Sequence, residues 1–345
     1  MSTQDERADT NPAVSVVVPN YNHARFLRAR LNSILAQTYR DFELIILDDA
    51  STDRSMEVIG EYRNLPGVRI HRNEKNSGSP FPQWNLGATM ARGRYLWIAE
   101  ADDEADPKFL ETLVATLDAN REVVLAYCQS RRIDARGSSI GNLCDWTEGL
   151  DGERWRSAFI NAGVDEISRF LIQRCTIPNA SAVVFRRDAY LEVGGAPTHL
   201  RMVGDWVTYV KILKLGKIAF TPAALNSFRS HAASVRADMG RDENCAEFLD
   251  EYLLVFRTIS GEFSIPQEVL AKVVRQLVQR WLQCVQNAPV SPSFHWAFQT
   301  SRFLGQFEGV GQWSLLDRYL RARAWKTPGI RECLGLVKKG FPSSR

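Results

Sequence analysis

Short apolar runs alternate with helical patterns over the first two thirds of the chain. Five runs rich in branched and aromatic residues predict buried strands, at Val14–Val18, Phe42–Leu47, Val68–His71, Tyr95–Ala99 and Val123–Tyr127. The segments between them have helical spacing of apolar residues, and Leu27, Leu31 and Ile34 fall on one face of the first. This alternation predicts an α/β domain with a mostly parallel central sheet flanked by helices on both faces.

The pattern is less regular after the fifth run. Residues 132–179 show no clear periodicity, so we expect an insertion of loops and short helices that covers the ligand-binding edge of the sheet. Strand character returns at Ala182–Phe185 and again at Leu225–His231, and a helix is expected from Asp205 to Leu215. The α/β domain is therefore expected to continue well beyond the insertion.

Beyond Gly240 the chain becomes helical in character. A regular four-residue apolar spacing between Val269 and Val285 predicts one amphipathic helix, which Pro289 and Pro292 should end. We therefore predict three parts: a polar N-terminal tail over residues 1–13, an α/β domain over 14–239, and a helical C-terminal region with a basic tail over 240–345.

An acidic cluster follows the fourth strand. Five carboxylates occur within seven positions, namely Glu100, Asp102, Asp103, Glu104 and Asp106. Ligands of open α/β sheets bind at the carboxyl ends of the strands, and hard divalent ions prefer oxygen ligands. Taken alone, the cluster fits a Mg²⁺ or Mn²⁺ site and a solvated loop at the start of the next helix equally well.

The second strand also ends in acids, with Asp48, Asp49 and Asp53 around a Ser-Thr pair. The carboxyl ends of parallel strands meet at one edge of the sheet, so the two acidic segments are expected to be neighbours there. The hydroxyl and carboxylate side chains also suit the start of the next helix.

Charge and composition narrow the choice of partners. The 345 residues carry a net charge of only +3, which gives no indication of a nucleic acid partner. Between Arg318 and Arg345, however, eight Lys or Arg residues stand against one acid, Glu332. This basic tail is expected either to contact an anionic membrane surface or a phosphate-bearing acceptor, or simply to be solvated.

The six cysteines are dispersed, with none of the spacing typical of zinc or redox pairs, so they are expected to be reduced thiols. The first dozen residues are polar and acidic, unlike a signal peptide, and no apolar run has the length of a membrane span. The expected location is the cytoplasm, with peripheral contact at the inner face of the membrane through the basic tail.

Several segments together resemble family 2 glycosyltransferases of the GT-A fold. They are S-V-V-V-P-N-Y-N from Ser15, D-D-A-S-T-D from Asp48, G-R-Y-L-W-I-A-E-A-D-D from Gly93, and G-D-W from Gly204. The likeness spans residues 14–234, and the motifs occur in the family's order, which is more specific than any single motif. It implies a Rossmann-like GT-A domain. The helical C-terminal region lies outside the resemblance.

The resemblance implies a nucleotide pocket at the carboxyl ends of the first three predicted strands. It implies that Pro19 and Tyr21 line the base pocket and that Asp49 accepts a hydrogen bond from the base. Asn76 and Asn85 match the polar segment after the third strand and are expected to contact base or ribose. The alternatives are a helix-capping role for Asp49 and ordinary turn chemistry for the two asparagines.

The resemblance also implies a divalent cation, Mg²⁺ or Mn²⁺. Asp102 and Asp103 match the D-x-D region, in which one acid holds the ribose or the metal and the other holds the metal. Glu100 stands where many members have Asp, which leaves open which acid ligates directly. His231, in an R-x-H segment, is expected to be a further metal ligand or a diphosphate contact, and a structural role is its alternative.

Asp205 matches the family's general base. Its expected task is to take the proton from the acceptor hydroxyl as that oxygen attacks the anomeric carbon opposite the leaving diphosphate. The alternative reading, an N-cap for the following helix, is compatible with this role.

The implied reaction is transfer of a sugar, with inversion, from a nucleotide-diphosphate sugar to an acceptor hydroxyl. A UDP-sugar is the favoured donor, with GDP and dTDP sugars as alternatives. A glycan or a lipid-linked molecule is the expected acceptor, in the synthesis of a bacterial cell-surface polysaccharide. The rival function is a catalytically degenerate GT-A protein that binds nucleotide or glycan as a scaffold.

Overall fold

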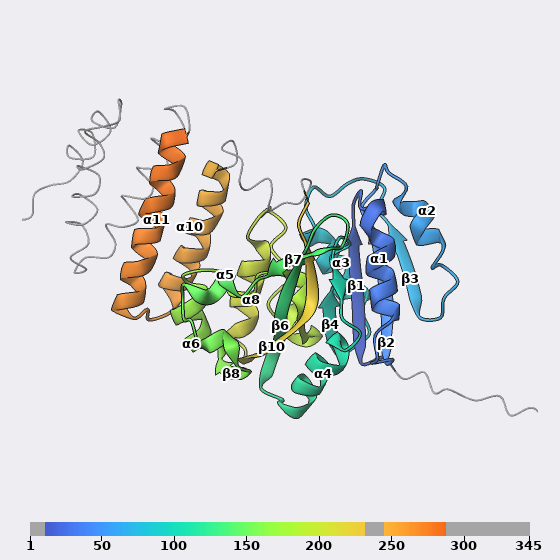
Figure 1. The fold of residues 1–345 in the computed structure, drawn as a ribbon, viewed down its shortest axis with the longest axis horizontal. Coiled ribbons are helices and arrows are strands. Elements are labelled where there is room, and N and C mark those ends of the chain that lie inside the picture. Colours follow the sequence, from blue (N-terminus) through green and yellow to red (C-terminus); the bar gives the residue numbers. More distant parts are fainter. Residues whose placement is uncertain (1–10, 232–244, 288–345) are drawn as a thin grey trace, which may run out of the picture. The chain divides into compact units, whose positions relative to one another are not determined.

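The structure is a computed structural model that describes residues 11–231 and 245–287 (Figure 1). The chain divides into two compact units, one up to Ala232 and one from Ala233. The boundary expected between residues 239 and 240 lies outside the described residues. No helix within the described ranges combines the length and the apolar character needed to cross a membrane.

The first unit is built on a ten-stranded sheet (Figure 1). The strand order is β3-β2-β1-β4-β9-β6-β10-β5, with β7 added to β6 and β8 added to β10. The strands are β1 (Val14–Asn20), β2 (Phe42–Asp48), β3 (Val68–Arg72), β4 (Tyr95–Ile98), β5 (Glu104–Ala105), β6 (Val123–Ile133), β7 (Ser139–Asn142), β8 (Phe159–Ala162), β9 (Val183–Arg186) and β10 (Lys217–Arg229). The mostly parallel, helix-flanked sheet predicted from the sequence is confirmed.

The helices of this unit connect the strands and cover both faces of the sheet (Figure 1). They are α1 (Ala24–Leu35), α2 (Ser55–Gly60), α3 (Phe81–Met90), α4 (Phe109–Ala119), α5 (Asp145–Glu148), α6 (Gly163–Glu166), α7 (Arg187–Glu192) and α8 (Gly204–Leu213). Short helical turns occur in addition at Arg154–Arg156, Ile167–Leu171 and Ala180–Ala182.

Strand β1 shows why the central strands read as continuous apolar runs. All seven of its residues are buried, because helices lie on both faces of the sheet. Val16 and its alternate neighbours pack into a core with α1 and α4. Val17 points to the opposite face, where Gly87 of α3 comes so close that an added Cβ would lie 2.3 Å from the Val17 side chain. The sheet is thus held between two helical layers.

Strand β1 continues past Val18, where the predicted strand ended, and includes Pro19. Pro19 and Asn20 still pair with Leu47 and Asp48 of β2. On the other side, β4 pairs with β1 only as far as Val17. Pro19 therefore lies where the strand has a single neighbour, which is the position in a sheet where proline is tolerated.

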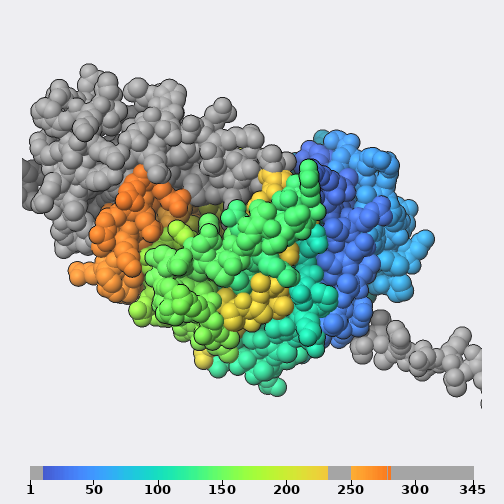
Figure 2. Space-filling view, viewed as in Figure 1, coloured from blue at the N-terminus to red at the C-terminus, as the bar shows by residue number. Residues whose placement is uncertain are grey.

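The segment 132–179 is more regular than its sequence suggests. Instead of loops and short helices alone, it contributes β7, which pairs with β6, and β8, which pairs with residues 217–220 of β10. In the space-filling view its green atoms form a broad surface beside the yellow atoms of β10 (Figure 2). The expectation of a purely irregular insertion over the ligand edge is wrong, because two of its short strands extend the sheet itself.

The second unit contains α10 (Cys245–Glu262) and α11 (Gln267–Asn287). The apolar stripe predicted from Val269 onwards lies on α11, where Val273 and Leu277 are fully buried. Within this unit the Arg280 guanidinium lies over the Tyr252 ring, 4.7 Å from its centroid. Pro289, Pro292 and the basic tail lie outside the described residues.

Candidate functional site

The carboxyl ends of β1, β2 and β4 meet at one edge of the sheet, because these strands are parallel neighbours. The end of β10 reaches the same edge through a short antiparallel pairing. There Asn226 and Ser227 of β10 pair with Ala105 and Glu104 of β5, directly after the acidic residues. This pairing places the segment that ends in His231 beside the acidic loop, although the two are more than a hundred residues apart in sequence.

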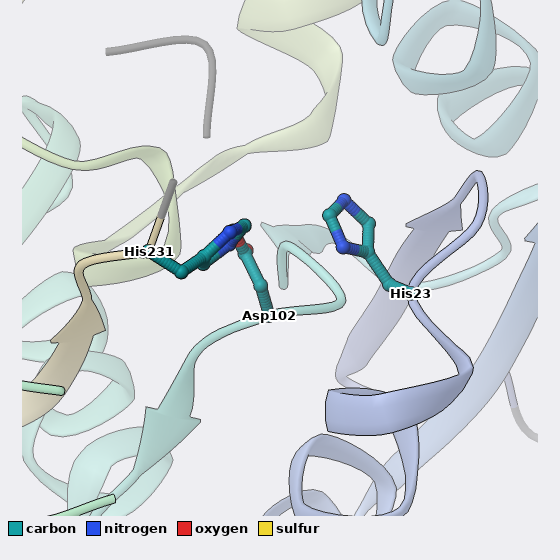
Figure 3. Close-up of side chains that lie close together, drawn as sticks. All are labelled: His23, Asp102 and His231. Carbon is teal, nitrogen blue, oxygen red and sulfur yellow. The ribbon is translucent and has the colours of Figure 1, made fainter. Parts of the chain in front are cut away.

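Asp102 is the acid of this loop that meets imidazoles. Its Oδ2 lies 3.0 Å from Nε2 of His231, and the side chain of His23 approaches the pair from the turn before α1 (Figure 3). One ligand atom from each of the three side chains lies within 4.8 Å of the other two. Among the described residues these three form the group able to hold a metal ion together.

The donor set fits a divalent cation. Asp102 supplies a carboxylate oxygen and each histidine supplies a ring nitrogen, all of which are ordinary ligands of first-row divalent ions. The Asp102 side chain is 18% exposed and that of His231 is 6% exposed, so both are largely buried but Asp102 still reaches the surface.

The electrostatics of the group suit an ionised acid between two imidazoles. Burial acts to raise the pKa of Asp102, but the hydrogen bond with His231 and the charges of His23 and His231 lower that pKa overall. Burial lowers the pKa of His23, while the charge of Asp102 opposes that change. A neutral imidazole at His23 presents a lone pair, which is what ligation requires.

Asp103 is not part of this group, although the sequence predicted it as a metal ligand. Its side chain is 2% exposed, and its two oxygens accept hydrogen bonds from the Asn179 amide and the Arg229 backbone N–H, both at 2.8 Å. Burial, aided by the charge of Asp102, raises the pKa of Asp103 to about 6, while the charge of Arg30 opposes the shift. The structure thus uses Asp103 to hold the acidic loop to the end of β10.

Glu100 faces the helix α3 side of the loop. Its Oε1 accepts a hydrogen bond from the Trp84 indole at 2.8 Å, and its backbone carbonyl accepts one from Nε of Arg30, also at 2.8 Å. Burial, and then the charge of Asp102, raise the pKa of Glu100 to about 8. Arg30 is fully buried below the loop, and its Nη2 also lies 3.9 Å from Oδ2 of Asp103. The positive charge of this one guanidinium therefore compensates several carboxylates of the loop.

Asp49 is enclosed by the segment that follows β3. Its carboxylate, 3% exposed, accepts hydrogen bonds from Asn73 and Gln83 on one oxygen and from Asn76 and Ser77 on the other, at 2.7 to 3.2 Å. The structure therefore brings the predicted base-pocket residues Asp49 and Asn76 into direct contact. Asn76 donates directly to the Asp49 carboxylate, and this bond holds the segment after β3 over Asp49.

The remaining pocket residues lie in different settings. Pro19 is buried in β1, and Tyr21 is 43% exposed in the turn after it. Asn85 lies in α3, where its amide donates to the Ala196 carbonyl and its oxygen accepts from Tyr190 and from the Ala196 N–H. These bonds give Asn85 a structural use, and its predicted nucleotide contact stays a prediction.

Asp205 lies in the first turn of α8, where Val203 is the N-cap; the expected capping position for Asp205 is therefore wrong. Its Oδ1 accepts a hydrogen bond from the backbone N–H of Trp206 at 2.7 Å. A chain of close contacts links this turn to the acidic loop. Gly204 packs against the Phe81 ring, and Phe81 packs edge-on against Trp84, the indole that donates to Glu100.

Two assignments at this edge were not foreseen. His23 was not predicted as a site residue, although its place directly after the P-N-Y-N turn of a central strand was a usable signal. Arg229, the arginine of the R-x-H segment, donates to the Asp102 and Asp134 backbone carbonyls and pairs with Glu104. A buried guanidinium holding three loop groups has a structural role.

Residues 15–175 match the family model described as glycosyl transferase family 2. This part of the chain is similar to that family. The match contains His23, Asp49 and Asp102, whereas Asp205 and His231 lie beyond its end.

Curated relatives agree with the family. The chain is 32% identical over 146 residues to the hyaluronan synthase of Pasteurella multocida, a stretch covering 42% of this chain and 15% of that protein. It is 24% identical over 249 residues to an uncharacterized glycosyltransferase of Haemophilus influenzae, covering 68% and 70% of the two chains. The chain thus spans only a small part of the synthase.

Solved structures show the same GT-A fold. The structure of S. aureus TarS 1–349 in complex with UDP-GlcNAc has a TM-score of 0.59 at 16% identity, covering 81% of this chain and 82% of that one. The mannosyltransferase PcManGT of Pyrobaculum calidifontis, in complex with GDP-Man and Mn²⁺, has a TM-score of 0.57 at 19% identity, covering 92% and 87%. The fold expected from the sequence is confirmed.

Proposed function

We propose that this chain is an inverting glycosyltransferase that moves a sugar from a nucleoside-diphosphate sugar to an acceptor hydroxyl. The observation that carries the proposal is the convergence at one sheet edge of Asp49 after β2, Asp102 after β4 and His231 after β10, with Asp205 linked to them through Phe81 and Trp84. The likeness to family 2 supports the same reaction class.

The donor nucleotide would bind across the ends of β1 and β2. Tyr21 offers an exposed ring beside Pro19, and Asp49 can accept an N–H from a base such as uracil. Because Asp49 already accepts several protein hydrogen bonds, the base N–H would replace donors from Asn76 or Ser77. A UDP-sugar is the proposed donor, since the TarS structures hold UDP and UDP-GlcNAc, with a GDP-sugar as the alternative suggested by PcManGT.

Asp102 and His231 are the residues that would hold a divalent cation, Mg²⁺ or Mn²⁺. Such an ion supplies neutralisation of the charge that develops on a departing diphosphate. Asp103 is assigned no ligand role here, because its two oxygens bind Asn179 and Arg229.

Asp205 is the proposed general base. Its carboxylate would take the proton of the acceptor hydroxyl while that oxygen forms a bond to the anomeric carbon. The bond from that carbon to the diphosphate oxygen breaks, and the nucleoside diphosphate leaves with the bonding electron pair on the opposite side. The configuration at the anomeric carbon is therefore inverted, as in any single in-line displacement.

The test compares two aspartates at matched helix positions. Asp188 occupies the first turn of α7 and, like Asp205, binds the N–H of the next residue, Ala189, at 2.8 Å. Helix α7 follows β9, which is antiparallel to β4, so Asp188 lies at the opposite edge of the sheet. We expect Asp205→Asn to lower kcat for transfer from UDP-GlcNAc by about 10²- to 10⁴-fold, with UDP affinity unchanged. Asp188→Asn should match wild type.

The scaffold alternative predicts a different result. A degenerate protein would bind UDP in calorimetry yet show neither transfer nor donor hydrolysis in the wild type, for every UDP, GDP or dTDP sugar offered. Equal activity of wild type and Asp205→Asn would instead remove Asp205 from the reaction and leave the transferase class intact.

The biological setting is proposed from the relatives. A role in bacterial cell-surface polysaccharide synthesis is supported by the likeness to a hyaluronan synthase and to a poly(ribitol-phosphate) N-acetylglucosaminyltransferase. A lipid-linked acceptor and membrane contact follow from the basic residues between Arg318 and Arg345, which lie outside the described residues. Deleting residues 318–345 should weaken sedimentation with anionic vesicles, and unchanged sedimentation would contradict this contact.

A further inference from the structure

The turn between β1 and α1 contains His23, whose imidazole has no role in the proposed reaction. We infer that His23 is a third cation ligand, and that the resulting set of two imidazoles and one carboxylate selects Mn²⁺ over Mg²⁺. This rests on the proposed use of a divalent cation at Asp102, and it adds a residue and a metal preference to that site.

The backbone around His23 is fixed from both sides. The preceding residue, Asn22, adopts a left-handed conformation with φ of 58°, its N–H donates to Ser51 Oγ, and its side-chain oxygen accepts from the Thr52 N–H at 2.8 Å. The following residue, Ala24, donates its N–H to Asp53 at 2.9 Å. A backbone held by these hydrogen bonds on both sides restricts the direction in which the His23 side chain points.

The carbonyl of His23 is fixed as well, because it accepts the first backbone hydrogen bonds of α1 from Phe26 and Leu27, both at 2.9 Å. The end of β2 and the start of α1 thus clamp this one residue. A position needed only to start a helix does not require a histidine, since residues with short polar side chains are preferred there. His23 makes no side-chain capping hydrogen bond to α1.

The two imidazoles are held together by an apolar neighbour. The ring centroids of His23 and His231 are 5.9 Å apart, and the buried Phe26 ring lies 4.7 Å from His231 and 6.2 Å from His23. The side chains of His23 and His231 lie close to the Asp102 carboxylate (Figure 3). Because both imidazole rings already pack against the Phe26 ring, they lose little rotamer freedom when they bind an ion.

The spacing suits an ion with ligand bonds of about 2.1 Å, for which adjacent donors lie about 3 Å apart and opposite donors about 4.2 Å apart. The 3.0 Å between Asp102 and His231 equals the adjacent distance. The outer limit of 4.8 Å for the whole group is slightly larger than the opposite distance, so a small inward movement completes the site.

The donor chemistry sets the preference. Mg²⁺ demands oxygen ligands and retains its water, whereas imidazole nitrogen suits first-row transition ions. A site with one carboxylate and two imidazoles therefore penalises Mg²⁺ more than the set expected from the sequence, in which Asp102 and Asp103 supply two carboxylates and His231 one imidazole. Open coordination positions remain for diphosphate oxygens.

The experiment uses the full chain and Mn²⁺ as the probe, with and without UDP. Affinity is measured by calorimetry, and nitrogen ligation by electron spin-echo envelope modulation of bound Mn²⁺ in protein labelled with ¹⁵N-histidine. The variants are His23→Ala and His231→Ala, with His199→Ala as the control, because His199 is exposed and outside the group. Circular dichroism verifies that each variant is folded.

We expect modulation from two histidine nitrogens in the wild type and in His199→Ala, and from one in each of the other variants. The Mn²⁺ dissociation constant should rise roughly tenfold or more in His23→Ala, since even partners of metal ligands cost 10–100-fold when removed. His23→Asp should restore binding with a smaller preference for Mn²⁺ over Mg²⁺ in competition.

The inference is overturned if folded His23→Ala keeps the wild-type Mn²⁺ affinity and the wild-type modulation. It is also overturned if Mg²⁺ displaces Mn²⁺ at equal concentration. Absence of Mn²⁺ binding in the wild type would end both this inference and the cation assignment. The transferase proposal would still stand or fall separately, on the Asp205→Asn comparison.

Discussion

Strands β2 and β4 both end in adjacent acids, yet the structure surrounds those acids differently. After β2, both oxygens of the Asp49 carboxylate accept hydrogen bonds from the segment that follows β3. After β4, both oxygens of Asp103 also accept hydrogen bonds, whereas Asp102 lies beside two imidazoles and is still partly exposed. Only the surroundings distinguish an acid that holds a loop from an acid that can hold an ion.

The difference has a physical origin. An ionised carboxylate in a protein must be compensated by donors or cations, because burial without them is costly. At Asp49 and Asp103 the compensation comes from neutral N–H and hydroxyl groups and from Arg30, so the carboxylates are already satisfied. At Asp102 the facing groups are imidazoles, which can turn from hydrogen bonding to metal ligation.

The largest expected effect follows from removing the cation below the acidic loop. Arg30→Met leaves Asp103 buried without its opposing charge and removes the bond to the Glu100 carbonyl. Breaking a buried ion pair in this way typically costs about 3–5 kcal/mol of stability. We expect a loss of this size in the free energy of unfolding by urea.

Arg28→Met in the same helix is the matched control. Its ion pair with Glu61 is about half exposed, so its removal should leave the free energy of unfolding nearly unchanged. Equal losses for the two variants would mean that the acidic loop does not depend on an internal cation.

The second effect concerns Asp102, where we expect a change in function without a change in stability. Asp102→Asn should weaken Mn²⁺ binding and lower kcat/KM by at least about a hundredfold, because it removes a proposed ligand. Asp106→Asn in the same loop is the control, since Asp106 bonds the Lys108 N–H and lies outside the metal-binding group. An unfolding transition shifted more by Asp102→Asn than by Asp106→Asn would make Asp102 a structural acid like Asp103.

The smallest expected effect tests the enclosed acid after β2. Ser77→Ala removes the hydroxyl that donates to Asp49 at 2.7 Å and keeps the backbone N–H that donates at 2.9 Å. One lost hydrogen bond should cost about 1 kcal/mol of stability and speed hydrogen exchange in residues 73–79.

The same variant reports on the proposed base contact. If a base N–H replaces loop donors on Asp49, removing one donor in advance should tighten UDP binding by up to about fivefold. Weaker UDP binding in calorimetry would instead show that the Ser77 hydroxyl itself lines the pocket.

Much of the fold could be predicted because its signals are local. The runs that became β1, β2 and β4 are apolar on both faces, and the stripe on α11 repeats with helical spacing, so burial alone dictates these patterns. The strands within 132–179 were not predicted, since β7 and β8 are only four residues long and β8 pairs with β10, which is distant in sequence. Short edge strands have too few residues to show a period.

The site could be predicted only in part, because several of its contacts join residues that are far apart in the sequence. Order and spacing of the motifs were enough to place Asp49 and Asp102 at one sheet edge. They could not show that Asp103 turns toward Asn179, or that Arg229 is used inside the loop, because those contacts span 76 and 125 to 127 positions in the chain.

By itself, the sequence determined the likeness to family 2 glycosyltransferases, the α/β layering and the acids that follow the central strands, because each depends on residue types at short spacing. Only the tertiary structure decided which of those acids faces a possible ion. That choice depends on β5 pairing with β10, which carries His231 to Asp102, and on the turn that holds His23 opposite. Ligation requires atoms within a few ångströms, and distance in space is set by packing rather than by distance along the chain.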